Sequence, residues 1–351
     1  MLKVLKAAGL AVSALTLATA GGAMAEDLQR APESVVYFIN GTLGDKSFFD
    51  SAERGIQRIN AEMGIETKTV EGGYDPTRWE AALFDIAESG DYDTIVAGTF
   101  TMVPLIEKIA VEFPEIRFVV FDGTVDYAVC GCENVYSILF RQNEGAYVAG
   151  ALSARLTTAG VEDIAEGSKL GVVGAMPIPV IDDFLVGYEA GAKSIIPEIE
   201  VLKQYSNSFA DPAVGKEIGK AMYDQGASIV FQVAGASGQG TIEAAVEAGR
   251  YVIGVDSDQA LLFEESRPET AERIFTSVLK QVDNSVVYAF EQLQKGELKL
   301  GSAESLGLKE GAIAIAVNKY TDAVVPADVM EEIKAIEAKI IDGSIDVPTT
   351  L

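Results

Sequence analysis

Lys169-Leu170-Gly171-Val172-Val173-Gly174 is a short apolar run that predicts a buried strand, and a helical pattern follows it over residues 179–194. The same alternation continues with strands at 199–205, 228–233 and 251–255 and helices at 211–225 and 240–248. An equivalent series precedes it, with strands at 34–40, 93–98 and 117–122 and helices at 50–63 and 103–113. Continuous apolar strands separated by helices indicate a parallel sheet covered on both faces. Two such series predict an α/β protein with two doubly wound parallel-sheet lobes.

The remaining segments predict how the chain passes between the two lobes. Residues 140–145 lie between the two series and lead into a helix of small residues at 146–156. The later elements are strands at 273–278 and 312–317 and helices at 283–295 and 326–341. We expect an N-terminal lobe of residues 34–142 plus about 258–300, and a C-terminal lobe of about 150–256 plus 305–345. A hinge and a ligand cleft would lie between the lobes.

The first 25 residues have the pattern of a secretory signal peptide. Lys3 and Lys6 precede a largely apolar run over residues 7–20, and Ala23-Met24-Ala25 forms the cleavage site. The run is shorter than the roughly 20 residues that span a bilayer, which disfavours a membrane anchor. No cysteine lies near the cleavage point, so we expect a soluble periplasmic protein that is cleaved after Ala25 and is not a lipoprotein.

The composition excludes several classes of function. The chain has no histidine and two cysteines, which rules out Ser-His-Asp and Cys-His nucleophiles, His-ligated metals and an all-thiolate zinc site. The 53 acidic residues outnumber the 27 basic ones, for a formal net charge of −26, and such a surface repels nucleic acid. We expect no cofactor and no catalysis, and a monomer.

The residues that follow each predicted strand are the candidates for ligand binding, because ligands of doubly wound sheets bind at the carboxyl ends of the strands. These segments are 40–49, 98–102, 122–123, 174–177, 207–209, 235–240, 256–258 and Lys280. They carry carboxylates, which accept hydrogen bonds from hydroxyl groups, and aromatic rings, which stack on flat apolar groups. The candidates are Asp45, Asp122, Asp256, Phe48, Phe209 and Lys280. This combination suits a neutral ligand with a hydroxylated part and a planar part.

Two short motifs have weaker functional interpretations. Gly235-Ala236-Ser237-Gly238-Gln239-Gly240 lies between a strand and a helix, but its glycine spacing departs from the dinucleotide fingerprint. A tight turn that presents backbone N–H groups to a ligand is favoured over a nicotinamide site. Cys130-Gly131-Cys132 favours a local disulfide, with a turn at Gly131, over two free thiols or a redox site.

Several motifs, taken in order, resemble the BMP (basic membrane protein, PnrA-like) family of ABC-transporter substrate-binding proteins, over residues 35–317. They are Gly44-Asp45-Lys46-Ser47-Phe48, residues 140–150, Ile178-Pro179-Val180-Ile181, residues 208–212, residues 233–238, residues 255–259 and Thr276-Ser277-Val278-Leu279-Lys280. The resemblance implies a type I periplasmic binding fold, a solute held between the lobes and a membrane ABC permease as partner. Characterised members mostly bind purine nucleosides.

The resemblance also implies roles for individual residues. Phe48 and Phe209 would sandwich the base, and Asp45 belongs to the same motif as Phe48. Asp122 would contact the base or the sugar, while Asp256 and Lys280 would hold the ribose hydroxyls. The ligand would lie against Gly235 and Gly238. Asp258 is an alternative to Asp256, which we favour.

The chain departs from the family pattern on the side that would recognise the base. The first strand of the family usually ends in an acid, whereas here Ile39 or Asn40 stands there, and Phe49 replaces an amide. A free base, a flavin or a sugar is therefore an alternative to a nucleoside. An exported hydrolase or nucleosidase that uses Asp122 and Asp256 is a less favoured alternative. The sequence does not separate transport from presentation of the solute to a membrane sensor.

Overall fold

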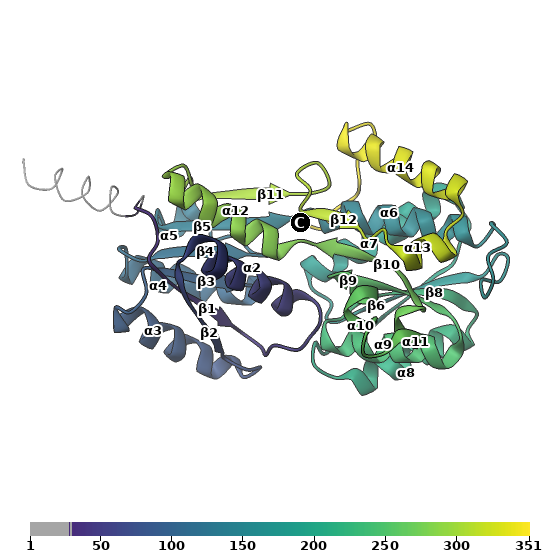
Figure 1. Cartoon of the computed structure of the whole chain (residues 1–351), viewed down its shortest axis with the longest axis horizontal. Coiled ribbons are helices and arrows are strands. Elements are labelled where there is room, and N and C mark those ends of the chain that lie inside the picture. Colours follow the sequence, from purple (N-terminus) through teal and green to yellow (C-terminus); the bar gives the residue numbers. More distant parts are fainter. Residues whose placement is uncertain (1–27, 29) are drawn as a thin grey trace, which may run out of the picture.

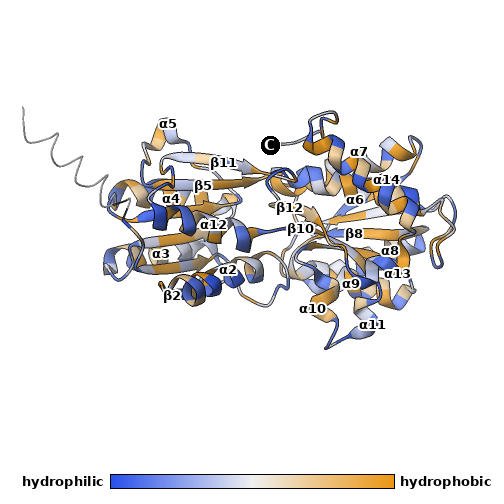
Figure 2. Cartoon of the chain, turned by 45° about the horizontal axis from the view of Figure 1, so that its top comes forward, coloured by the Kyte–Doolittle hydropathy of each residue, from blue (hydrophilic) through white to orange (hydrophobic). Residues whose placement is uncertain are grey.

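The computed structural model describes residue 28 and residues 30–351, which form two lobes, each built around a six-stranded sheet (Figure 1). The predicted signal peptide, residues 1–25, lies outside the described residues. Figure 2 shows strongly hydrophobic strands inside the lobes, as in β8, while surface helices such as α2 present hydrophilic residues. No helix within the described residues is both long and apolar enough to span a bilayer.

The sheet of the first lobe has the strand order β11-β5-β4-β3-β1-β2, and all its pairs are parallel. Its strands are β1 (Ser34–Ile39), β2 (Glu66–Glu71), β3 (Thr94–Gly98), β4 (Arg117–Phe121), β5 (Val135–Phe140) and β11 (Ser302–Leu306). The central strands β3 and β4 are buried at every position, because helices cover both faces of the sheet.

The sheet of the second lobe has the order β12-β10-β9-β8-β6-β7, which repeats the arrangement of the first. Its strands are β6 (Lys169–Gly174), β7 (Val201–Tyr205), β8 (Ala227–Val233), β9 (Tyr251–Asp256), β10 (Ile274–Lys280) and β12 (Ile313–Ile315). Only β12 runs antiparallel, to β10, among the described strands. By position β9 therefore corresponds to β4, and β7 to β2.

Helices cover both sheets. Those of the first lobe are α2 (Phe48–Met63), α3 (Trp79–Ser89), α4 (Val103–Glu112), α5 (Tyr127–Cys130) and α12 (Val282–Lys295), with 3-10 turns η1 (Pro76–Arg78) and η2 (Phe100–Met102). Those of the second lobe are α6 (Gln142–Leu156), α7 (Pro179–Ile195), α8 (Pro212–Asp224), α9 (Ala236–Ala248), α10 (Gln259–Phe263), α11 (Pro268–Ala271), α13 (Lys319–Val324) and α14 (Ala327–Ile341).

The strand pairing corrects the expected lobe boundaries. We expected residues 258–300 in the first lobe, but β10 pairs with β9, so the chain returns to the first lobe only after Lys280. Strand β11 pairs with β5 in the first sheet, and the chain crosses back to the second lobe between β11 and β12. The boundary at 258 is therefore wrong, because the partner of a strand depends on contacts that its own sequence does not specify.

Close packing of α6 against α7 positions one wall of the site described below. Gly150 and Gly191 lie where the helices meet, and a Cβ at Gly191 would overlap the carbonyl oxygen of Tyr147. The N-terminal turns of α7 belong to the same core. The spacing of these helices therefore depends on glycine at both positions.

The variant Gly191→Ala is expected to lower the free energy of unfolding by about 1–3 kcal/mol, because the helices must separate to admit the methyl group. This cost outweighs the gain in helix propensity, which is at most about 1 kcal/mol. Urea denaturation measures the difference. Ser194→Ala, on the same helix, removes one side-chain hydrogen bond to the backbone and serves as the control. Equal stability of the two variants would contradict this role for Gly191.

Candidate ligand-binding site

The carboxyl ends of the two sheets face each other across a cavity of about 360 Å³. Its walls come from segments that follow strands in both lobes and from the first turns of α7. The cavity lies where ligands of doubly wound sheets bind. Most of its lining is aromatic or aliphatic, and a few polar groups interrupt it, as in small-molecule sites generally.

Seven of the eight predicted site residues line this cavity. They are Asp45, Phe48, Asp122, Phe209, Gly235, Asp256 and Lys280. Gly238 does not line it: this residue lies in α9, and a Cβ there would overlap the side-chain oxygen of Gln232. Glycine at 238 allows α9 to pack closely on β8, and the cavity lining does not support the predicted ligand contact at this position.

Lys280 forms the electrostatic centre of the site. It ends β10 in the second lobe, its side chain is 2% exposed, and its ammonium group pairs with the carboxylate of Asp122 in the first lobe. The Nζ atom also lies 5.4 Å from the ring centroid of Phe48, 5.0 Å from that of Phe140 and 5.6 Å from that of Phe184. A desolvated ammonium group is stabilised by these ring faces as well as by its carboxylate partner.

Asp256 is a buried carboxyl group at the end of β9. Burial raises the pKa of Asp256 to about 7; the charge of Lys280 and a hydrogen bond from the Ser47 hydroxyl oppose this shift, while Asp45 and Asp122 add to it. The neighbouring candidate Asp258 instead caps α10 and accepts hydrogen bonds from the Asn318 side chain at 3.0 and 2.9 Å. The structure thus brings Asp256, and not Asp258, to the cavity.

Asp45 has a different role from the other two acids. Its carboxylate accepts hydrogen bonds from the backbone N–H groups of Ser47 at 3.0 Å, Phe49 at 2.9 Å and Asp50 at 3.2 Å. These bonds order the entry into α2, and burial raises the pKa of Asp45. Asp45 therefore positions Phe48 at the cavity wall, although its own oxygens are already engaged.

Backbone conformation at the strand ends is unusual in equivalent places of both lobes. Asp122 follows β4 with φ of 60°, and Asp256 ends the corresponding strand β9 with φ of 62°. Thr99, after β3, has φ of 74°, and Gly235, close after the corresponding β8, has φ of 56°. Left-handed conformations at non-glycine residues are uncommon and concentrate at functional sites. The corresponding positions of β4 and β9 thus place one acid from each lobe at the cavity.

Three polar residues of the first lobe lie outside the predicted set of site residues. Asn40, at the end of β1, donates from its side-chain nitrogen to the hydroxyls of Thr99 and Thr101, both at 2.8 Å. All three line the cavity, and the side-chain oxygen of Asn40 is buried without a hydrogen-bond partner among the described residues. The segments after the strands included these residues, and Asn40 stands at a place where the family usually has an acid, but nothing in the sequence identified Thr99 or Thr101.

The loop before α2 joins the lobes directly. Its backbone oxygens accept hydrogen bonds from Gln239 and Gln259 of the second lobe, at 3.2 Å to Gly44 and 3.0 Å to Lys46. The Ser257 hydroxyl donates to the carbonyl oxygen of Ser47 at 3.2 Å. These hydrogen bonds link the two lobes beside the cavity.

The three acids do not form a metal site, because no group of three or more His, Cys, Asp or Glu side chains in the described part of the chain could hold a metal ion.

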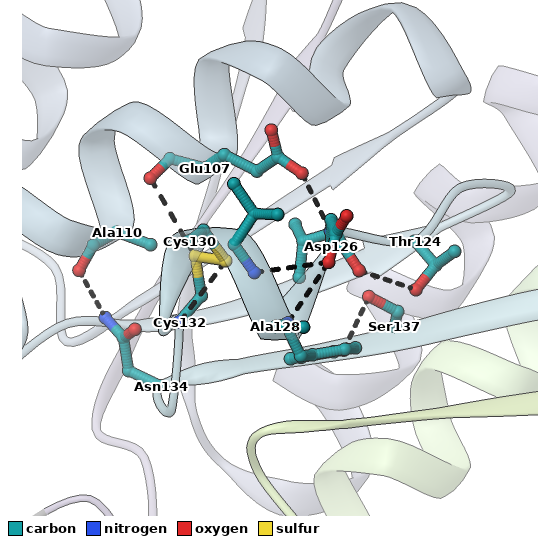
Figure 3. The surroundings of a disulfide bond; sticks show 12 residues. Glu107, Ala110, Thr124, Asp126, Ala128, Cys130, Cys132, Asn134 and Ser137 are labelled. Carbon is teal, nitrogen blue, oxygen red and sulfur yellow. Dashed lines mark hydrogen bonds between the residues drawn. A yellow bond between two sulfur atoms is a disulfide. The ribbon is translucent and has the colours of Figure 1, made fainter.

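The structure joins Cys130 and Cys132 in a disulfide, as the sequence favoured, with Gly131 in a left-handed turn (Figure 3). Neither cysteine lines the cavity. Asp126 caps the short helix α5 that carries the disulfide.

Comparisons with known proteins agree with this geometry. The family model for "ABC transporter substrate-binding protein PnrA-like" matches residues 33–350. Basic membrane protein A1 of Borrelia garinii subsp. bavariensis is 30% identical over 317 residues, covering 90% of this chain and 88% of that protein.

Two solved structures are similar to this chain. The ABC transporter solute-binding protein from Aeropyrum pernix K1 has a TM-score of 0.78 and 27% identity, covering 90% of this chain and 94% of that one. The solute-binding protein from Conexibacter woesei DSM 14684 has a TM-score of 0.72 at 22% identity, covering 91% and 99%, and shows the fold alone. The predicted type I periplasmic binding fold is confirmed.

Proposed function

Because this chain belongs to the PnrA-like family of ABC transporter substrate-binding proteins, we propose that it captures a purine nucleoside or a similar flat, hydroxylated solute. The observation that carries this proposal is the convergence of Phe48, Phe209, Asp122, Asp256 and Lys280 on one cavity between the lobes. The rings offer faces to a planar group, and the carboxylates accept hydrogen bonds from sugar hydroxyls.

The charges of the cavity favour an unphosphorylated solute. Three carboxyl groups, Asp45, Asp122 and Asp256, face a single ammonium group, that of Lys280. A phosphate would bring further negative charge to a desolvated site that already contains an excess of acids, and this repulsion is strong at low dielectric. We propose that nucleosides bind and that nucleotides do not.

Asn40 favours a solute with an N–H group on the edge of its planar part. The side-chain nitrogen of Asn40 is engaged by Thr99 and Thr101, so only its oxygen remains to bind a ligand. A buried acceptor left unpaired costs about 1–3 kcal/mol, which a ligand donor would recover. A neutral amide at this place accepts such a donor without adding a fourth acid to the cavity.

The transport cycle that we propose begins with closure of the lobes on the solute, a hinge motion around the bound ligand. The hydrogen bonds to the loop of residues 44–47 form only when the lobes meet, and the Lys280–Asp122 pair also spans them. The closed, monomeric protein in the periplasm then delivers the solute to a membrane permease. Cleavage after Ala25 and the absence of a lipid anchor are parts of this proposal.

Thermal unfolding and calorimetry of the exported protein test the function. We expect adenosine, inosine or guanosine to raise the melting temperature, and adenosine monophosphate to leave it unchanged. Chromatography of the recovered solute is expected to return it intact, whereas a nucleosidase would return free base and ribose. The absence of stabilisation by any nucleoside, base, flavin or sugar would overturn the proposal.

The variant Phe209→Leu is expected to weaken nucleoside binding by roughly two- to twelvefold, since an aromatic stack contributes about 0.5–1.5 kcal/mol beyond its buried area. Phe209 is 38% exposed, so the substitution disturbs little of the core. Calorimetric titration measures the effect. Val214→Ala, a 37% exposed position of the same lobe outside the cavity lining, is the control and should bind like the native protein.

A further inference from the structure

The cavity continues well beyond the group of acids around Lys280. Asp122 follows β4, while the segment of residues 74–79 follows β2, three strands further along the same sheet. Neighbouring strands are about 4.8 Å apart, so these two ends of the lining are separated by roughly 14 Å. Asp122, Asp256 and Lys280 occupy one end, and the other end has a different chemistry.

The lining between the end of β3 and this far end is an aromatic annex, by which we mean Phe49, Tyr74, Pro76, Trp79 and Phe100. It has no charged member, and three segments of the first lobe contribute to it. Trp79 donates its indole N–H to the carbonyl oxygen of Gly73 at 2.9 Å. Because this bond already satisfies its polar atom, Trp79 offers only an apolar surface to a ligand.

Two rings of the annex are exposed to an unusual degree for their size. Tyr74 is 44% exposed and Phe100 is 40% exposed, yet both line the cavity. Phe209, the predicted stacking ring of the second lobe, lies beside Gly235. The carbonyl oxygen of Phe209 accepts a hydrogen bond from the backbone N–H of Ser237 at 3.2 Å. Gly235 follows β8, which corresponds to β3, so the annex extends one to two strands beyond the position of Phe209.

A ligand that only filled the space between Phe209 and the acids would leave the annex in contact with water. Clustered exposed rings in a concave site indicate an apolar group that covers them when the ligand is bound. We propose that the solute has an uncharged planar part longer than a single purine, such as fused rings or a purine with an aryl substituent, and that this extension lies in the annex.

This inference rests on the proposed function and narrows its substrate class. The hydroxylated part of the solute would bind at Asp256 and Lys280, and the Asn40 oxygen, at the end of β1, would accept an N–H group between the stacked ring and the annex. An extended ring system is preferred because it removes apolar surface of the annex, and its own apolar surface, from water. It requires no additional charge on the solute.

Calorimetric titration with adenosine, N6-benzyladenosine and riboflavin tests the inference. We expect at least one of the two extended probes to bind about tenfold more tightly than adenosine, because it buries apolar area that adenosine leaves exposed. In Tyr74→Ala, the affinity for that probe is expected to fall about fivefold while the affinity for adenosine stays unchanged. Tyr74 is largely exposed, so this variant should fold.

The matched control is Tyr288→Ala, which removes a 42% exposed tyrosine from α12, outside the cavity lining, and should change neither affinity. Adenosine binding as tightly as both extended probes would overturn the inference and leave the proposed function intact. Equal weakening of adenosine and the extended probe by Tyr74→Ala would also overturn it. Failure of all three probes to bind would overturn the nucleoside-like function and the inference together.

Discussion

Solute binding is expected to weaken at least about a hundredfold when Lys280 is replaced by methionine. Methionine fills much of the same volume and can contact Phe48, Phe140 and Phe184, but it carries no charge. Removing one partner of a buried ion pair typically costs about 3–5 kcal/mol, and a hundredfold change in affinity corresponds to about 2.7 kcal/mol. Because the Lys280–Asp122 pair joins the two lobes, its loss destabilises the closed, solute-bound state and thereby weakens binding.

The double variant Lys280→Met with Asp122→Asn distinguishes two contributions of Lys280 to the affinity, its ion pair with Asp122 and its contact with the solute. It leaves no unpaired carboxylate at position 122, so closure should be partly restored and the affinity should recover by about tenfold relative to Lys280→Met alone. Calorimetry gives both affinities, and small-angle scattering reports lobe closure. Native affinity in the single variant would show that Lys280 contributes neither to closure nor to the solute contact.

Solute affinity is expected to rise about tenfold between pH 6 and pH 8. The pKa of Asp256 lies at about 7, so this carboxyl group is mostly protonated at pH 6 and mostly ionised at pH 8. Sugar hydroxyls donate more strongly to the ionised form, and binding therefore lowers the pKa of Asp256 and releases a proton near neutral pH. Affinity is lost as the pH falls through 7. Titrations in buffers of different ionisation enthalpy measure the proton release.

Asp256→Asn should remove this pH dependence. It should also lower the affinity at pH 8 by roughly 10- to 150-fold, since a hydrogen bond to a charged group contributes about 1.5–3 kcal/mol. Asp258→Asn is the matched control, because Asp258 caps α10 outside the cavity lining and its loss should leave the pH profile unchanged. A flat native profile between pH 6 and pH 8 would contradict ionisation of Asp256 as a condition for binding.

Much of the site could be predicted because it follows a general rule of parallel sheets. The apolar runs that form β4 and β9 are evident in the sequence, and their carboxyl ends identify Asp122 and Asp256 as candidates. Asp45 was found by the same rule, although its carboxylate engages the backbone at the start of α2 instead of remaining free for a ligand. The rule finds residues near a ligand site, but it does not distinguish those that contact the ligand from those that hold other residues of the site in place.

Some elements gave too weak a sequence signal to be predicted. Strand β2, Glu66–Glu71, alternates charged residues with threonine and valine at the edge of its sheet, and β11, Ser302–Leu306, contains mostly small and polar residues. Strand β5 is apolar, but its own residues do not specify that it pairs with β4 and β11, which lie far apart along the chain. Tyr74, Pro76 and Trp79 of the aromatic annex follow β2, so this part of the annex could not be anticipated.

The amino-acid sequence alone establishes the α/β class, the two successive series of strands and helices, the family, and most of the residues that reach the cavity. The period of apolar residues reports which side of each element is buried, and this is a local property. The folded structure adds that β10 belongs to the second lobe, that Lys280 pairs with Asp122, and that the Ser47 hydroxyl donates a hydrogen bond to Asp256 across 209 residues of chain. These facts depend on contacts between distant segments, which local periodicity does not specify.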